Sequence, residues 1–157
     1  MSIYIHDESD NGNNVSVFIK ITESINTAIF NDAYEIRRIV FVEEQHFPLS
    51  REIDELDSRA IHIVLYYIQQ PVACGRVSFC DDVAKICRVA VLMEYRNRGF
   101  ATAICEKLIA IARIKKSKTI FLHAQLPVIG LYENLGFKVT GQSFLEEGVP
   151  HIRMELL

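Results

Sequence analysis

Residues 89–109 read VAVLMEYRNRGFATAICEKLI, and this stretch is the most informative part of the chain for its fold. A β-rich apolar run leads into a short polar loop, and the loop leads directly into the pattern of an amphipathic helix. The first turn of a helix leaves backbone N–H groups unpaired and lies at the positive end of the helix dipole. This strand, loop and helix therefore predict an anion-binding site at residues 98–102.

The side chains of the loop suit a diphosphate. Gly99 leaves room where a phosphate approaches the backbone, Ala101 is small, and Thr102 adds a hydroxyl. Arg96 and Arg98 supply matching positive charge. The other phosphate-binding patterns, GxxxxGK[ST] and GxGxxG after a strand, do not occur. The alternative interpretation is an ordinary turn with two solvated arginines.

Periodicity predicts one α/β (α+β) domain with a mixed sheet and the element order β-α-βββ-α-β-α-ββ. The three consecutive strands are close enough to form an antiparallel meander, and the later βαβ crossover implies a parallel pair. We expect a flexible N-terminal arm over residues 1–14 and the domain over 15–157. The expected elements are a strand at 15–21, a helix at 27–43, strands at 61–68, 72–80 and 84–92, a helix after Gly99, a strand at 119–124, a short helix at 127–135, and strands at 137–145 and 151–157.

Composition narrows the class of protein. The 157 residues carry 17 Lys and Arg against 20 Asp and Glu, a net charge of -3, which argues against nucleic acid as a partner. The sequence has no apolar run of about 20 residues, the length that spans a bilayer, so no membrane partner is expected. The N-terminal residues lack a signal-peptide pattern, which predicts a cytoplasmic protein. The four cysteines lack CxxC spacing, so we expect free thiols and no metal.

Two motifs carry a family resemblance. RNRGFA at residues 96–101 fits the R/Q-x-x-G-x-G/A signature of the GNAT superfamily of N-acetyltransferases. QLPVIGLYENLGF at residues 125–137 is similar to the N-x-x-A-x-x-L-Y-x-x-x-G-F pattern of that family, with Gln125 in place of Asn and Val128 in place of Ala. The stretches VFVEEQHFP and EEGVPHIRM resemble the ElaA-like branch of the superfamily. The resemblance covers residues 15–157.

The resemblance implies a single-domain GNAT fold and an enzyme that moves an acetyl group from acetyl-CoA to a primary amine by direct attack. The amine belongs to a small molecule or a peptide, and a homodimer is compatible with the sequence. The alternative is a non-catalytic CoA-binding sensor or interaction module on the same fold. Residues implied in binding acetyl-CoA are Val89, Ala90, Val91, Arg96, Asn97, Arg98, Gly99, Phe100, Ala101, Thr102 and Gln125.

The second motif also implies a general acid, Tyr132. The departing CoA thiolate has the pKa of a free thiol, about 8.5, and a tyrosine with a pKa near 10 is protonated and able to neutralise it. The alternative for Tyr132 is a ring that only packs against the core.

An acidic stretch follows the first predicted helix, at the place where the family's acceptor site lies. Six carboxylates fall between Glu43 and Asp57, against one cation, Arg51. Such a cluster favours a cationic acceptor, whereas the alternative is a solvated acidic loop. Glu43 and Glu44 are the candidates for the general base, and the candidates for acceptor contact are Asp54, Asp57 and His151.

Overall fold

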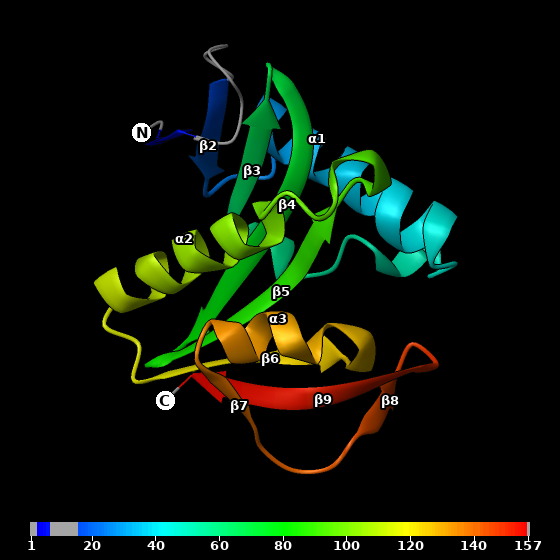
Figure 1. Cartoon of the computed structure of the whole chain (residues 1–157), viewed down its shortest axis with the longest axis vertical. Helices are drawn as coiled ribbons and strands as arrows, with labels where there is room; N and C mark the ends of the chain where they lie inside the picture. The colour runs from blue at the N-terminus through cyan, green and yellow to red at the C-terminus, as the bar shows by residue number, and fades with distance from the viewer. Residues whose placement is uncertain (1–2, 7–15, 157) are drawn as a thin grey trace.

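The computed structural model describes residues 3–6 and 16–156. Its strands form one sheet in the order β1-β2-β3-β4-β5-β6-β9-β7, and β8 pairs with β9 beside this path (Figure 1). The strand pair β5–β6 is parallel, and the other pairs are antiparallel, which confirms the predicted meander and the mixed sheet. The strand bounds are β1 Ile3–His6, β2 Ser16–Thr22, β3 Ile61–Tyr67, β4 Gln70–Cys80, β5 Val83–Val91, β6 Thr119–Gln125, β7 Phe137–Val139, β8 Phe144–Glu146 and β9 Val149–Leu156.

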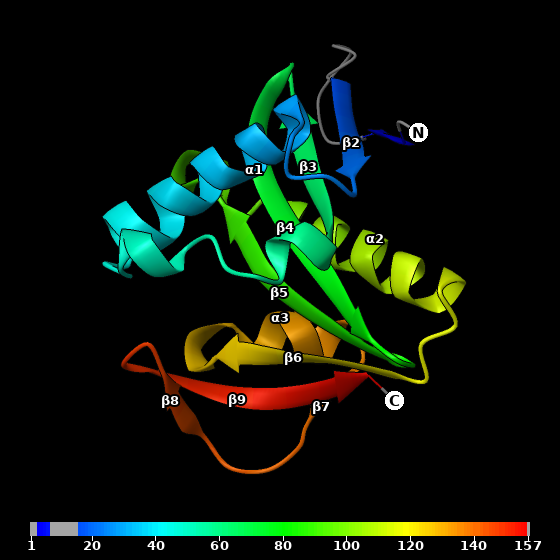
Figure 2. The ribbon, with the colours of Figure 1, turned by 180° about the vertical axis from the view of Figure 1, so that it is seen from behind.

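Helices cover both faces of the sheet, as the two opposite views show (Figures 1 and 2). On one face lie α2 (Phe100–Ile114) and α3 (Ile129–Asn134). On the other face lies α1 (Ala28–Arg37), which continues as a π-helical segment (Arg38–Glu44). The larger hydrophobic core includes the buried side of α2, and a smaller core lies under α1. Within residues 3–6 and 16–156, no helix has the length and apolar character needed to cross a membrane.

A glycine in β4 lets α2 pack close to the sheet. A Cβ atom on Gly75 would lie 2.7 Å from Ile104 Cγ2 and 2.8 Å from Leu108 Cδ1. Both side chains belong to the buried stripe of α2 that the 3.6-residue period predicts. A side chain at Gly75 would therefore push the helix away from the sheet and displace the N-terminal end of α2.

Strand β5 carries a bulge and then separates from β6. Arg76 pairs with Cys87, but Cys74 pairs with Ala90, so β5 has one extra residue here. Arg88 lies within the bulge with a φ of 57°. The parallel pairing of β5 with β6 ends at Ile86 and Leu122. Beyond this point the two strands diverge (Figure 2). We call residues 87–91 of β5 and 123–125 of β6, which face each other without pairing, the splay.

The structure differs from the sequence prediction at three places. Residues 3–6, expected in a flexible arm, form β1 on the edge of β2, because the alternating IYIH segment is β-prone. The remaining arm residues lie outside the described ranges. The predicted strand 137–145 is divided into β7 and β8, with Gly141 at a φ of 97° between them. The first helix is α-helical to Arg37 and π-helical from there to Glu44.

Candidate active site

The N-terminus of α2 has the geometry of an anion site. Gly99 is its N-cap and has a φ of 80°, in the left-handed region, where a side chain is strained. A Cβ built on Gly99 meets no atom within 4 Å, so the space in front of the helix end is open. The guanidinium of Arg98 lies 5.4 Å from the ring centroids of both Tyr67 and Tyr95, a cation–π arrangement that places it beside this end.

Arg96 is placed differently from the prediction that it faces a diphosphate. Its two terminal nitrogens lie 2.7 and 2.5 Å from the carboxylate oxygens of Glu44, and its Nε donates to the Val91 carbonyl at 3.0 Å. This bidentate pair joins the loop before α2 to the end of the π-helical segment. The hydrogen bond from Arg96 lowers the pKa of Glu44 against the opposing effect of burial. Glu44 is thus a weaker base than an unpaired glutamate, which contradicts its assignment as the general base.

The open edge of β5 directs backbone donors into the splay. The Leu92 N–H donates to the Val72 carbonyl of β4 at 2.9 Å. Because donors alternate between the two edges of a strand, the N–H groups of Val89 and Val91 point toward the splay. The carbonyl of Val91 already accepts from Arg96. Two backbone N–H groups are therefore directed to the edge where an extended ligand could pair.

Gln125 lies across the splay at the end of β6. Its Nε2 donates to Gln45 Oε1 at 2.8 Å, so it contacts the residue that follows the π-helical segment. The splay therefore has backbone donors on its β5 side and a side-chain amide on its β6 side.

Tyr132 is a buried residue of α3. Its ring meets Phe137 edge to face, with 6.0 Å between the centroids. Burial raises the pKa of the Tyr132 hydroxyl above its ordinary value, and the nearby thiols of Cys105 and Cys87 raise it further. Among the described residues, the hydroxyl has no hydrogen-bond partner. The hydroxyl is therefore protonated at neutral pH and available to donate a proton. Cys87, whose thiol influences the pKa of this hydroxyl, belongs to the splay.

The acidic stretch is largely an internal ion network. Arg37 lies 2.7 Å from Glu52 and 2.8 Å from Asp57, and all three side chains are buried. Arg76 lies 2.7 Å from Asp57 and 2.8 Å from Asp54. Burial alone would raise the pKa of Asp57, but the two arginines outweigh it and hold the pKa at about 2.

This network includes both carboxylates predicted to contact the acceptor, Asp54 and Asp57. Asp57 is 1% exposed and cannot contact an acceptor, and Asp54 is shared between Arg76 and Arg88. Glu43 is paired with Arg38, so its assignment as the general base also loses its basis. Arg38 pairs with Glu43 from within the same helical segment, and more distant arginines reach the other four carboxylates. Five of the six carboxylates are thus in ion pairs: Glu43, Glu44, Glu52, Asp54 and Asp57.

His151 belongs to a cluster of side chains that was not predicted from the sequence. It pairs with Gln125 across β6 and β9, and its Nε2 lies 3.7 Å from Glu146 Oε2. The other oxygen of Glu146 lies 3.4 Å from His123 Nδ1. The Phe144 ring lies 4.8 Å from the His123 ring and 6.3 Å from the His151 ring, centroid to centroid. Alternation along β6 places His123 and Gln125 on one face, which was the signal available in the sequence.

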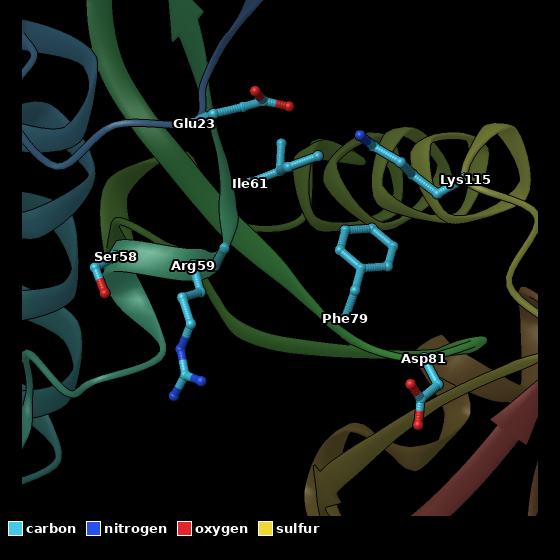
Figure 3. A pocket seen from close by; sticks show the side chains of 8 residues that line it. Glu23, Ser58, Arg59, Ile61, Phe79, Asp81 and Lys115 are labelled. Carbon is cyan, nitrogen blue, oxygen red and sulfur yellow. The ribbon is translucent and has the colours of Figure 1, made fainter.

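A hollow of about 420 Å³ lies elsewhere, at the other end of the sheet (Figure 3). It combines the apolar side chains of Ile61 and Phe79 with charged groups at its margin. None of the predicted site residues lines it, so we place the candidate active site at the splay. The lining residues are Glu23, Ser58, Arg59, Ala60, Ile61, Phe79, Asp81 and Lys115.

Comparison with known proteins identifies the family. The model of the acetyltransferase (GNAT) family matches residues 27–137. The chain belongs to the GNAT family. The matched range includes the splay, the N-terminus of α2 and Tyr132. This GNAT protein is an acetyl-CoA-dependent N-acetyltransferase.

Relatives of the GNAT protein cover most of its length. It is 37% identical over 130 residues to the uncharacterized protein YyaT of Bacillus subtilis, spanning 81% of this chain and 88% of that protein. It is 36% identical over 124 residues to the uncharacterized N-acetyltransferase YjcF of the same bacterium, spanning 78% and 89%. Escherichia coli ElaA superposes with a TM-score of 0.80 at 24% identity, covering 90% of this chain and 99% of that one. At that identity the likeness to ElaA is one of fold.

Proposed function

We propose that the enzyme transfers the acetyl group of acetyl-CoA directly to a primary amine at the splay. The observation that carries the proposal is the continuity of two features. The open edge of β5 carries the inward N–H groups of Val89 and Val91, and the chain then passes through the 3-10 helix Met93–Tyr95 and a short loop to the N-terminus of α2. An extended ligand with a diphosphate at one end fits this combination.

The diphosphate of CoA would lie at the N–H groups of residues 98–102, where the helix dipole and the Arg98 guanidinium favour negative charge. Thr102 and Ala101 remain part of this proposal. The proposed role of Arg96 is indirect: its ion pair with Glu44 holds the loop before α2 in place.

The pantetheine arm would pair with β5 as an added strand, a mode in which main-chain hydrogen bonds supply affinity. The Val91 N–H would then polarise the thioester carbonyl while it becomes an oxyanion. Gln125 would exchange its bond to Gln45 for bonds to the pantetheine amides. The backbone of the splay thus supplies both binding and electrostatic stabilisation.

Tyr132 is the proposed general acid. Its raised pKa keeps the hydroxyl protonated until the thiolate forms, and the hydroxyl is close enough to the splay residue Cys87 for that thiol to influence its pKa. The departing thiolate is desolvated in the same surroundings, which raises its proton affinity as well.

The proposed acceptor is a primary amine of a small molecule or a peptide. The ion network neutralises most of the charge of residues 52–57, because Arg37, Arg76 and Arg88 balance Glu52, Asp54 and Asp57, which leaves Glu55 outside the network. A preference for cationic amines therefore has no support from this loop. Asp54 is part of that network, and His151 remains a proposed acceptor contact because it lies opposite Gln125.

A panel of primary amines assayed with acetyl-CoA tests this function. We expect thiol release that depends on the amine and matches the N-acetylated product one to one by mass spectrometry. A protein that binds acetyl-CoA but releases no thiol with any amine would instead be the non-catalytic CoA-binding module.

A further inference from the structure

We propose that His123 is the general base of the reaction, held in its working tautomer by Glu146; this inference rests on the proposed function. His123 is the first residue of β6 beyond the last β5–β6 pair, so it stands where the splay opens. It lies two residues before Gln125, on the same face of the strand. Its side chain is 22% exposed, so part of the ring is open to solvent.

Glu146 determines which ring nitrogen can accept a proton. The carboxylate lies 3.4 Å from His123 Nδ1. Because an ionised carboxylate only accepts hydrogen bonds, it favours the tautomer with the proton on Nδ1. The lone pair is then on Nε2, at the other end of the ring. Glu146 is a positioning residue in this scheme.

The groups around His123 keep the imidazole neutral. Burial is the largest influence and lowers its pKa below the ordinary 6.5. Lys85 on β5 and Arg153 on β9 lower it further, whereas Glu146 on β8 raises it. His151, also on β9, donates from Nδ1 to the Val149 carbonyl at 2.7 Å and presents Nε2 to Glu146. At neutral pH, His123 is therefore in the form that accepts a proton.

The two glutamates predicted as the general base are committed elsewhere. Glu43 and Glu44 are held by arginines, and Asp57 is buried between two of them. His62 is 1% exposed, and its Nε2 lies 2.8 Å from the Asp57 carbonyl, away from the splay. Within residues 3–6 and 16–156, His123 Nε2 has no hydrogen-bond partner, and the residue lies on the splay.

Two proton transfers accompany the transfer of the acetyl group. The amine nitrogen attacks the thioester carbon, forming the C–N bond, while the proton on nitrogen passes to His123 Nε2. The C–S bond then breaks, its electron pair leaves on sulfur, and the Tyr132 hydroxyl gives that sulfur a proton. His123 releases its proton to solvent and Tyr132 regains one from solvent. A free amine and acetyl-CoA thus yield the amide and CoA thiol.

The variant His123→Asn tests the base with two acceptors. For an alkylamine we expect kcat/KM to fall by about 10²- to 10⁴-fold, the usual contribution of a general base. For an arylamine, whose nitrogen becomes a much stronger acid on attack and can lose its proton to water, we expect a much smaller loss. Lys85→Met is the matched control in the same region, because it changes the local charge without removing a base. An equal loss with both amines, or none with the alkylamine, would overturn the proposal.

Titration of the His123 ring by NMR gives a readout that does not need turnover. We expect a pKa below 6.5 that rises in Lys85→Met, because a cation is removed, and falls in Glu146→Gln, because an anion is removed. The acid limb of the pH profile of kcat/KM should move by the same amounts with a fixed acceptor. A His123 pKa that is the same in both variants as in the wild type would refute the placement of Lys85 and Glu146 beside the ring. If the His123 ring titrates as expected but the wild-type enzyme acetylates no amine, the proposed function is refuted instead.

Discussion

Substitutions at Gly99 test the assignment of the CoA diphosphate to the N-terminus of α2. Gly99 has a φ of 80°, and an added Cβ meets no atom within 4 Å. Asn and Asp enter the left-handed region more readily than other side chains. Gly99→Asn and Gly99→Asp therefore carry a similar backbone cost and nearly the same volume, and they differ by one negative charge.

The size of the charge effect follows from Coulomb's law. Two unit charges about 4 Å apart interact by about 1 kcal/mol in bulk water and about 4 kcal/mol at an effective dielectric constant near 20. A carboxylate beside the diphosphate should therefore weaken acetyl-CoA binding by roughly 5-fold to 10³-fold relative to the Asn variant.

Isothermal titration of both variants with acetyl-CoA measures this difference. The gap in Kd should narrow as salt rises, because the Debye length falls from about 10 Å at 0.1 M to about 3 Å at 1 M. Equal Kd values for the two variants at every salt concentration would refute the placement of the diphosphate.

Four further predictions concern catalysis and the fold. Tyr132→Phe should lower kcat by about 10²- to 10⁴-fold and leave the Kd for acetyl-CoA nearly unchanged; a wild-type kcat would reduce Tyr132 to a packing residue. Asp57→Asn should cost about 3–5 kcal/mol of unfolding free energy in denaturant titrations, because Arg37 and Arg76 lose their shared partner. The pKa of Asp57 is about 2 in the fold and 3.8 ordinarily, so its stabilisation, about 2 kcal/mol, is present above pH 4 and disappears between pH 4 and 2. A wild-type stability that stays flat over that range would contradict the pairing. Gly75→Ala should lower the melting temperature, because its methyl would meet Ile104 and Leu108 at under 3 Å; an unchanged value would show that α2 shifts at no cost.

Features encoded by neighbouring residues could be predicted from the sequence. The strand, loop and helix of residues 89–109 are contiguous, and the structure forms β5, the Gly99 cap and α2 there. The stripe of α2 also follows from its period alone. These local signals were sufficient for the order of the central elements.

Features that depend on distant partners could not be predicted. Counting charges over residues 43–57 found one cation, because Arg37, Arg76 and Arg88 reach the loop only through the fold. The bulge at Arg88 has no sequence signal such as a glycine. His123 and Glu146 come together only because β8 folds back onto β9.

Amide hydrogen exchange at the open edge of β5 tests the central claim most directly. Acetyl-CoA lying along the splay should protect the N–H groups of Val89 and Val91, which point to that edge. The Leu92 N–H, already bonded to Val72, serves as an internal control and should change little. Increased protection at Val89 and Val91, accompanied by residues 98–102, is the result that our account predicts. Unchanged exchange at Val89 and Val91 with saturating acetyl-CoA would contradict it.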